Sequence, residues 1–335
     1  MVTLKMLASA CNVSVATVSK ALNGAPDVGA ETTARIQRTA REMGYIPSAA
    51  ARNLKTNRSH SFGVIFDDGT NSGLSHEFFA VMLESFKRSA ESMGYDLFLI
   101  SGQPGPWGDD YLTHARYRNC DGVLVLVGDN VPTVAQDILR CGIPVVAIDY
   151  IVDNCSTVKS DNVQGMRDLV RYIYACGHRK IAAVLGEDTP VTRLRSASLF
   201  RTCGELGLEI PDCYIRTAFY HDPDSSALAT RQLLDLKDRP TCILYPDDFS
   251  VLGGLGEIER QGLSVPEDIS ITGFDGSLLA RNFRPRFTTV RQDNQAMGEI
   301  AAKELARAVE EGRRFIARET VVPCELLPGE TVIKL

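Results

Sequence analysis

The feature that most constrains the fold is an alternation, after residue 60, of short apolar runs with longer helix-like stretches. The runs are apolar throughout, and Gly94, Gly142, Gly177 and Gly262 each mark a helix end shortly before one of them. Continuous apolar strands are typical of sheets covered by helices on both faces. The pattern therefore predicts a doubly wound α/β body with mostly parallel sheets. The expected strands occupy residues 62–66, 97–100, 122–127, 144–148, 181–185, 242–245 and 269–274.

The body of about 275 residues is too long for one comfortable sheet, so we expect two lobes. The first 46 residues differ from it and show the pattern of three short helices. Leu4, Leu7 and Cys11 lie on one apolar stripe, and Ser14 is a good N-cap for a second helix that ends at Leu22. The third expected helix runs from about residue 30 to residue 44.

Three short helices with a tight turn between the first two predict an all-α helix-turn-helix unit. Its second helix would enter the major groove of DNA and present its early residues to base edges and phosphates. Those residues are Val15, Ala16, Thr17, Ser19 and Lys20. Helix pairs of this kind also occur in proteins that never contact DNA, so the helices alone leave both interpretations open.

Charge is distributed unevenly along the chain, and this favours the DNA-binding interpretation. Residues 1–58 contain three Lys and five Arg against Asp27, Glu31 and Glu42, a balance of +5. The whole chain carries −6, so the remainder carries −11. A basic head on an acidic body is expected when only the head meets a polyanion.

Residues 47–59 separate the head from the body. Pro47 prevents a continuous helix from upstream, and Ser48 could cap a new helix of about two turns, which would need DNA or a partner to form. Leu54 would then be an exposed apolar side chain suited to a wedge in the minor groove. The alternative is a plain linker with one leftover leucine.

Two motifs at matching spacing resemble the head and hinge of the lactose-repressor (LacI/GalR) family: VSVATVSKALNG at 13–24 and GYIPSAAARNL at 44–54. The resemblance continues at DNVQG (161–165), GHRKI (177–181), VPEDISITGFD (265–275) and TTVRQ (288–292). It implies a periplasmic-binding-protein-like body, a homodimer or tetramer, and a pseudopalindromic operator whose minor groove is opened by Leu54. The full set of expected DNA-binding residues is Thr3, Ser14, Val15, Ala16, Thr17, Ser19, Lys20, Asn23, Tyr45, Ser48, Ala51, Leu54 and Lys55.

The resemblance also implies a division of the chain. We expect a DNA-binding domain at 1–46, a hinge at 47–59 and an effector-binding and dimerisation domain at 60–335. Each lobe would be discontinuous, because the chain would cross between the lobes three times. The first lobe would comprise about 60–158 and 289–318, and the second about 159–288 and 319–335.

Open α/β sheets bind ligands at the carboxyl ends of their strands, where several aspartates are expected. An aspartate at such a place can also simply cap a helix or build a turn. Carboxylates near an arginine suit a polyhydroxyl ligand, and the family resemblance implies an effector between the lobes, which we expect to be a sugar or sugar derivative. The candidates are Asp67, Asp149, Arg195, Tyr220, Asp247 and Asp275.

This sequence departs from the family pattern in places that border the expected cleft. An Asn-Pro-Phe-Phe turn usually follows the first strand soon after Asp67, whereas here residues 68–77 precede Phe78-Phe79. Asp275 is followed by Gly276 where a second Asp is usual. The ligand is therefore least predictable on this side.

Other classes of protein fit the sequence less well. It has no P-loop and no Gly-x-Ser-x-Gly motif, and its five His lack metal-ligand spacing, so we expect no enzyme activity, cofactor or metal. No secretory signal or membrane segment is recognisable, which argues against a transport solute-binding protein and predicts a cytoplasmic, nucleoid-associated regulator. The nine Cys form no Cys-x-x-Cys pair and are expected to be buried, reduced thiols.

Overall fold

The structure is a computed structural model that describes residues 2–46, 53, 58–67, 73–106, 108–127 and 131–335. Its contacts divide the chain into two compact units, Met1–Ser59 and His60–Leu335. In the described part of the chain, no helix combines the length and the apolar character needed to cross a bilayer.

The first unit contains the three expected helices, α1 (Leu4–Ala10), α2 (Val15–Leu22) and α3 (Ala30–Glu42). Their apolar stripes meet in a small core in which Leu7, Val18 and Ile36 are fully buried. The predicted cap of α2 is confirmed, because the Thr17 backbone N–H donates to the Ser14 hydroxyl at 3.0 Å. The head thus owes its fold to periodic apolar residues and good caps.

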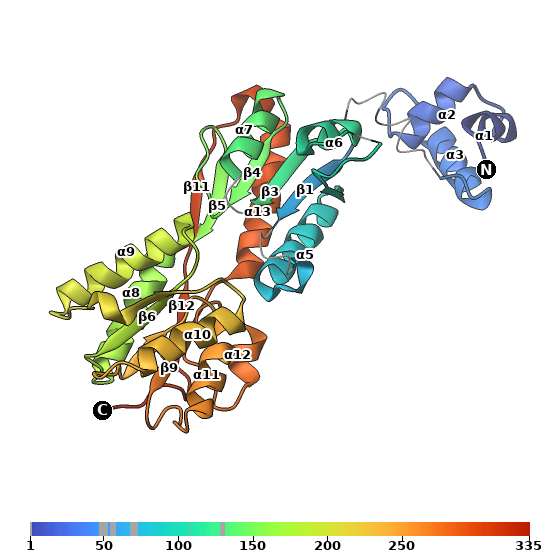
Figure 1. The fold of residues 1–335 in the computed structure, drawn as a ribbon. Coiled ribbons are helices and arrows are strands. Elements are labelled where there is room, and N and C mark those ends of the chain that lie inside the picture. The colour runs from blue at the N-terminus through green and yellow to red at the C-terminus, as the bar shows by residue number, and fades with distance from the viewer. Residues whose placement is uncertain (1, 47–52, 54–57, 68–72, 107, 128–130) are drawn as a thin grey trace. The chain divides into compact units, whose positions relative to one another are not determined.

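The second unit begins with a six-stranded, wholly parallel sheet in the order β11-β5-β4-β3-β1-β2, which we call the first lobe (Figure 1). Helices α5 and α13 pack on one face of it, and α6 and α7 pack on the other. The elements are β1 (Ser61–Asp67), η1 (Gly73–Ser75), α5 (Glu77–Ser92), β2 (Asp96–Ile100), α6 (Tyr111–Tyr117), β3 (Gly122–Val127), α7 (Val131–Arg140), β4 (Val145–Ile148), β5 (Ser156–Ser160), α13 (Asn294–Glu311), η3 (Gly312–Arg314) and β11 (Glu319–Val322).

The second lobe is built around a four-stranded parallel sheet in the order β7-β6-β8-β9. Helices α8 and α9 cover one face of it, and α10, α11 and α12 cover the other. The elements are α8 (Asn162–Ala175), β6 (Ile181–Leu185), α9 (Pro190–Glu205), η2 (Asp212–Tyr214), β7 (Ile215–Thr217), α10 (Pro223–Leu234), β8 (Cys242–Leu244), α11 (Ser250–Arg260), β9 (Ser270–Thr272) and α12 (Leu278–Asn282). Both sheets confirm the predicted α/β class.

The chain passes between the lobes after β5, between β10 (Thr289–Arg291) and α13, and between β11 and β12 (Glu325–Leu327). The predicted lobe boundaries at 158 and 318 were wrong, because β5 runs to Ser160 and β11 pairs with it in the first sheet. Figure 1 shows red β11 beside green β5. The boundary at 289 was also too early, since β10 pairs with β12 and Thr288 bridges to β9 in the second lobe.

The cysteines were expected to be free thiols and to be buried; the first expectation is confirmed for all of them and the second for most of them. All nine thiols are free, and seven of them are buried. Cys141, at the end of α7, and Cys213, just before β7, are exposed, because each lies in a surface turn rather than in a strand or on the inner face of a helix. One native thiol is therefore accessible on each lobe.

Candidate DNA-binding surface and ligand cleft

The first turn of α2 presents a surface of mixed chemistry to solvent. Val15 and Ala16 are exposed, and the Val15 side chain keeps 40% of its accessible surface although it is apolar. The Ser14 and Thr17 hydroxyls lie 2.8 Å apart beside them. An exposed valine and alanine can contact a thymine methyl, and the two hydroxyls can bind phosphate or a base edge.

The second turn of α2 is already engaged in contacts within the head. The Lys20 ammonium pairs with the Asp27 carboxylate, and this hydrogen bond lowers the pKa of Asp27. The Asn23 side-chain amide donates to the Ser19 carbonyl at 2.6 Å. Any contact of Lys20 with DNA would therefore have to replace or share its pairing with Asp27.

The remaining predicted DNA-binding residues fall into two groups. The Thr3 hydroxyl accepts the Met6 N–H at 3.3 Å and so caps α1, and Tyr45 packs in part against the head core. Ser48, Ala51, Leu54 and Lys55 lie outside the described residues.

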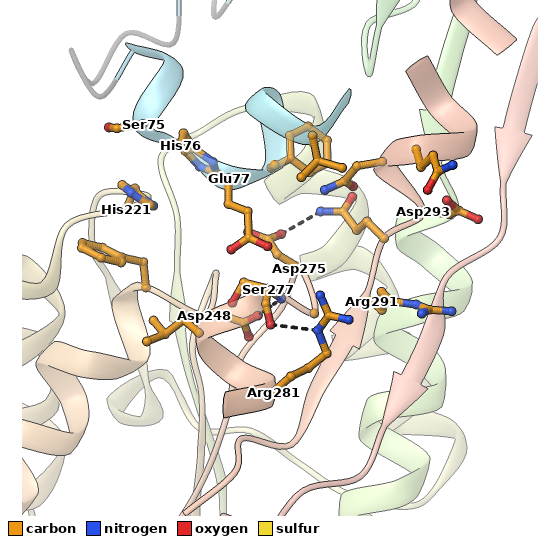
Figure 2. Close-up of a pocket in the computed structure, with 18 residues that line it drawn as sticks. Ser75, His76, Glu77, His221, Asp248, Asp275, Ser277, Arg281, Arg291 and Asp293 are labelled. Carbon is orange, nitrogen blue, oxygen red and sulfur yellow. Dashed lines mark hydrogen bonds between the residues drawn. The ribbon is translucent and has the colours of Figure 1, made fainter. Parts of the chain in front are cut away.

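A cavity of about 550 Å³ lies between the two lobes of the body (Figure 2). This volume is typical of sites for small ligands. Residues from the starts of α5 and α13 form the first-lobe wall, and the segments that follow β7, β8 and β9, together with the end of β10, form the second-lobe wall. Its lining includes Ser75, His76, Glu77, Phe78, His221, Asp248, Phe249, Asp275, Ser277, Arg281, Arg291, Gln292, Asp293 and Asn294.

Two carboxyl groups, the buried Asp248 and the partly buried Asp275, lie on the second-lobe side of this cavity. Asp248 Oδ1 accepts the Thr289 hydroxyl at 2.6 Å, and its Oδ2 accepts the Ser277 N–H at 2.8 Å. Burial outweighs these bonds and raises the Asp248 pKa to about 7. Asp275 Oδ1 accepts the Gln292 amide at 2.7 Å, and burial likewise raises its pKa well above the ordinary value.

The backbone at the second carboxyl group explains a departure from the family pattern. Asp275 has a φ of 109° and Gly276 a φ of 66°, both in the region that favours glycine. A Cβ at position 276 would lie 2.5 Å from the Arg291 Cα. The second Asp that is usual at this position cannot fit here without moving β10.

Arg195 is buried beside the carboxyl groups and is 7% exposed. Its Nε donates to Asn162 Oδ1 at 2.7 Å, one Nη donates to the Pro246 carbonyl at 2.9 Å, and its guanidinium carbon lies 3.6 Å from the Phe274 ring centroid. Its charge opposes the rise in the pKa of both Asp275 and Asp149. Arg195 thus compensates the negative charge of the cleft.

Three other predicted residues lie near Arg195 but do not line the large cavity. Burial raises the Asp149 pKa to about 6, and Asp149 Oδ1 accepts the Ser160 N–H at 3.1 Å at the first crossing between the lobes. Asp247 accepts the Ser250 N–H at 2.7 Å and the His221 N–H at 2.9 Å, so it organises the start of α11. Tyr220 packs over Gly186 in a small separate cavity that Arg195 also lines.

Asp67 ends β1, and the structure describes only its backbone. Of the residues predicted from the sequence, Asp275 lines the large cavity, and Asp149, Arg195, Tyr220 and Asp247 lie in its electrostatic surroundings. Sequence reasoning missed His76, Glu77 and Phe249 as lining residues, and in the aromatic cluster at 219–221 it selected Tyr220 where His221 lines the cavity. The unusual segment before Phe78 was the signal that could have identified His76 and Glu77.

Two family models match separate parts of the chain. Residues 3–48 match the family model "Bacterial regulatory proteins, lacI family", and residues 170–332 match "Periplasmic binding protein-like domain". The HTH-type transcriptional repressor CytR of Escherichia coli K12 is 31% identical over 332 residues, covering 97% of this chain and 94% of CytR. The HTH-type transcriptional repressor PurR of Klebsiella pneumoniae is 30% identical over 345 residues, covering 96% and 97%.

The fold also matches solved structures. The lac repressor dimer bound to operator and the anti-inducer ONPF has a TM-score of 0.84 at 22% identity, covering 99% of each chain. This likeness confirms the predicted helical head and two-lobed body with parallel sheets.

Proposed function

Because this chain belongs to the LacI family of bacterial regulatory proteins, we propose that it is a repressor that binds a palindromic operator as a homodimer under the control of a small molecule. Its curated relatives are transcriptional repressors rather than enzymes, as the sequence led us to expect. The protein acts in the cytoplasm, on the nucleoid.

The observation that carries the DNA-binding half of the proposal is the first turn of α2. Val15 and Ala16 are solvent-exposed on a helix whose start is fixed by Ser14, and residues 1–58, which contain this helix, have a net charge of +5. An exposed apolar side chain makes no favourable contact with water, but it makes a favourable apolar contact with a thymine methyl group. The similar lac repressor structure is a dimer bound to operator, which supports a two-fold symmetric target.

The hinge completes this DNA-binding proposal. Two copies of residues 47–59 form short helices in the minor groove, and Leu54 is the wedge between base pairs. Ser48, Ala51 and Lys55 contact the backbone beside it. A site that must be opened in this way favours flexible central base steps, so the hinge contributes specificity by deforming the DNA.

The cleft carries the control half of the proposal. A cavity of about 550 Å³ between two lobes, lined by carboxyl, guanidinium and amide groups, fits a small ligand rich in hydroxyl groups. A sugar or sugar derivative has that chemistry. Asp275 contacts it directly, while Asp149, Arg195, Tyr220 and Asp247 shape the field around it. Ligand binding changes the lobe arrangement, and DNA binds strongly in only one arrangement.

Selection of randomised DNA duplexes by the full-length protein tests the DNA half. We expect a two-fold symmetric sequence to be enriched. The Ala16→Glu variant should then bind it at least about tenfold more weakly, because its carboxylate would meet phosphates and base edges. Ala34→Glu makes the same change at an exposed alanine of α3, outside the predicted contact set, and should retain binding. Equal losses in both variants would refute the assigned surface.

A thermal-shift screen of sugars, sugar phosphates and nucleobases tests the control half. A ligand that binds the folded cleft raises the melting temperature. At a ligand concentration one hundred times its dissociation constant, it adds about 2.7 kcal/mol to the free energy of unfolding. The same compound should change the affinity for the selected operator. A stabilising compound that leaves operator affinity unchanged would refute the coupling between cleft and head.

A further inference from the structure

The start of α5 reaches across the cleft and contacts the second lobe at two points. α5 belongs to the first lobe, since it packs against α13 and the six-stranded sheet. The two residues that make the contacts, His76 and Glu77, directly precede Phe78-Phe79. They occupy the place where the family resemblance led us to expect Asn-Pro, so both contacts come from residues in which this chain departs from its family.

The first contact is a pair of hydrogen bonds between a carboxylate and a backbone N–H. The Leu278 N–H lies 2.9 Å from Glu77 Oε1 and 3.1 Å from Oε2, so one donor is shared by both oxygens. Leu278 begins α12, which is held in place by the Ser277 cap and by the Ser277 N–H bond to Asp248. Hydrogen bonds to an ionised acceptor are roughly twice as strong as neutral ones.

The second contact is a row of three aromatic rings. The His76 and His221 ring centroids lie 4.3 Å apart with the planes 23° from parallel, and His221 stacks on Phe249 at 4.0 Å and 16°. The backbone N–H of His221 donates to the buried Asp247 carboxylate, which anchors the main chain that carries the middle ring. The row therefore begins on the first lobe and ends on Phe249, the residue before α11 of the second lobe.

We propose that His76 and Glu77 form an interlobe clasp, which holds the two lobes closed on the α5 side of the cleft. Each lobe has its own cores, and three chain crossings join them, so contacts across the cleft decide how far they separate. Figure 2 shows His76 and Glu77 on the same helix end, facing His221 and Ser277. The clasp residues also line the cavity, so a bound ligand lies against the clasp.

This placement makes the clasp a means of regulation, a consequence that rests on the proposed function. A ligand that fits with the clasp intact stabilises the closed arrangement, and one that displaces His76 or Glu77 releases it. A ligand shifts the equilibrium between the closed and released arrangements only by its difference in affinity for the two. The free energy of the clasp therefore sets how large that difference must be to change the populations.

Hydrogen exchange of the Leu278 amide in the full-length protein, without DNA or ligand, tests the first contact. We expect Glu77→Ala to speed its exchange about tenfold, because the amide loses its carboxylate acceptor and the lobes separate more often. Glu84→Ala is the matched control: Glu84 is an exposed carboxylate on the same helix and pairs only locally, with Lys87 and Arg88. An unchanged exchange rate in Glu77→Ala, or an equal change in Glu84→Ala, would overturn the clasp.

The exposed thiols Cys141 and Cys213 allow the lobe arrangement to be measured directly, since one lies on each lobe. Spin labels on these native thiols should give a longer or broader distance distribution in His76→Ala than in the wild type. His76→Phe retains a ring and should restore the wild-type distribution. If His76→Ala matches the wild type, the stack does not hold the lobes and the clasp is refuted.

The experiments can refute the clasp and the proposed function independently of each other. Both readouts are taken without DNA, whereas operator binding is measured by selection and by the Ala16→Glu variant. A protein that shows the expected exchange and distances but selects no symmetric DNA keeps the clasp and refutes the operator proposal. A protein that selects the operator but shows no effect of Glu77→Ala or His76→Ala refutes the clasp alone.

Discussion

Replacing Asp248 with Asn should change how the stability of the protein depends on pH, because it removes a buried carboxyl group whose ionisation is unfavourable in the folded state. The Asp248 pKa is about 7, compared with 3.8 in the unfolded chain, because burial outweighs the bonds from Thr289 and Ser277. The folded state therefore holds its proton at pH values where the unfolded state has lost it. A group whose pKa is raised on folding contributes stability that is complete below the unfolded value and is lost as pH rises toward the folded value.

The size of the effect follows from these two pKa values. Between pH 5 and pH 8 the wild-type protein should lose roughly 2–3 kcal/mol of unfolding free energy through this group, at 1.36 kcal/mol for each pKa unit. Asn has the same shape and can accept the Ser277 N–H while donating to the Thr289 oxygen. The Asp248→Asn variant should thus avoid this loss and gain on the wild type as pH rises.

Urea unfolding followed by circular dichroism at pH 5 and pH 8 measures the prediction. The quantity of interest is the difference between variant and wild type at pH 8 minus the same difference at pH 5, so any packing defect of Asn cancels. Loss of the Asp248 charge also favours ionisation of Asp275, whose pKa it helps to raise, and this acts in the same direction. A value near zero, or a negative one, would refute the view that burial controls this carboxyl group.

Three further predictions concern the head, the centre of the cleft and the ligand. Asp27→Asn frees Lys20 and removes a negative charge, so operator affinity should rise roughly two- to tenfold at low salt in fluorescence anisotropy; a lower affinity would contradict it. Arg195→Ala should cost about 3–5 kcal/mol of unfolding free energy, with a larger cost at pH 8 than at pH 5 because Asp275 and Asp149 lose their counter-charge; a cost independent of pH would contradict it. A hydroxyl-rich ligand from the screen should bind more tightly by calorimetry as pH rises from 5 to 8, since it donates to ionised Asp248, and a flat profile would contradict that contact.

The sequence predicted those elements whose pattern is local. The three head helices and seven of the body strands could be located because apolar periodicity and helix caps act over a few residues. The remaining strands are short or polar. In β5, Ser156 and Ser160 are buried without being apolar, and Ser156 is satisfied by a 2.7 Å bond to Glu304 on α13. Such a strand owes its burial to a partner far along the chain, which a local pattern cannot reveal.

The same physical limit applies to the cleft. Asp275 could be predicted because any strand of a parallel sheet delivers its following residue to one edge. For His76 and Glu77, the unusual segment before Phe78 marked the place in the sequence. Their contacts could not be predicted, since they begin a helix of one lobe and their partners His221 and Leu278 belong to the other. A chain that crosses three times between lobes brings together residues whose sequence neighbours give no sign of the meeting.

The hydrogen bonds already present in the cleft indicate what kind of ligand it can accept. Asp248 accepts two bonds and Asp275 one bond from a side chain, while an ionised carboxylate offers about four acceptor positions. Arg195 is already engaged by Asn162 and Pro246 within the second lobe. Among the carboxyl groups and Arg195, the capacity that remains is thus mainly acceptor capacity in groups that resist ionisation, while Arg281 and Arg291 supply donors in the exposed part of the cavity. A ligand with several hydroxyl or amine donors can donate hydrogen bonds to these carboxyl oxygens and so offset the free-energy cost of ionising the carboxyl groups. A ligand with acceptors alone makes no such hydrogen bonds and does not offset that cost.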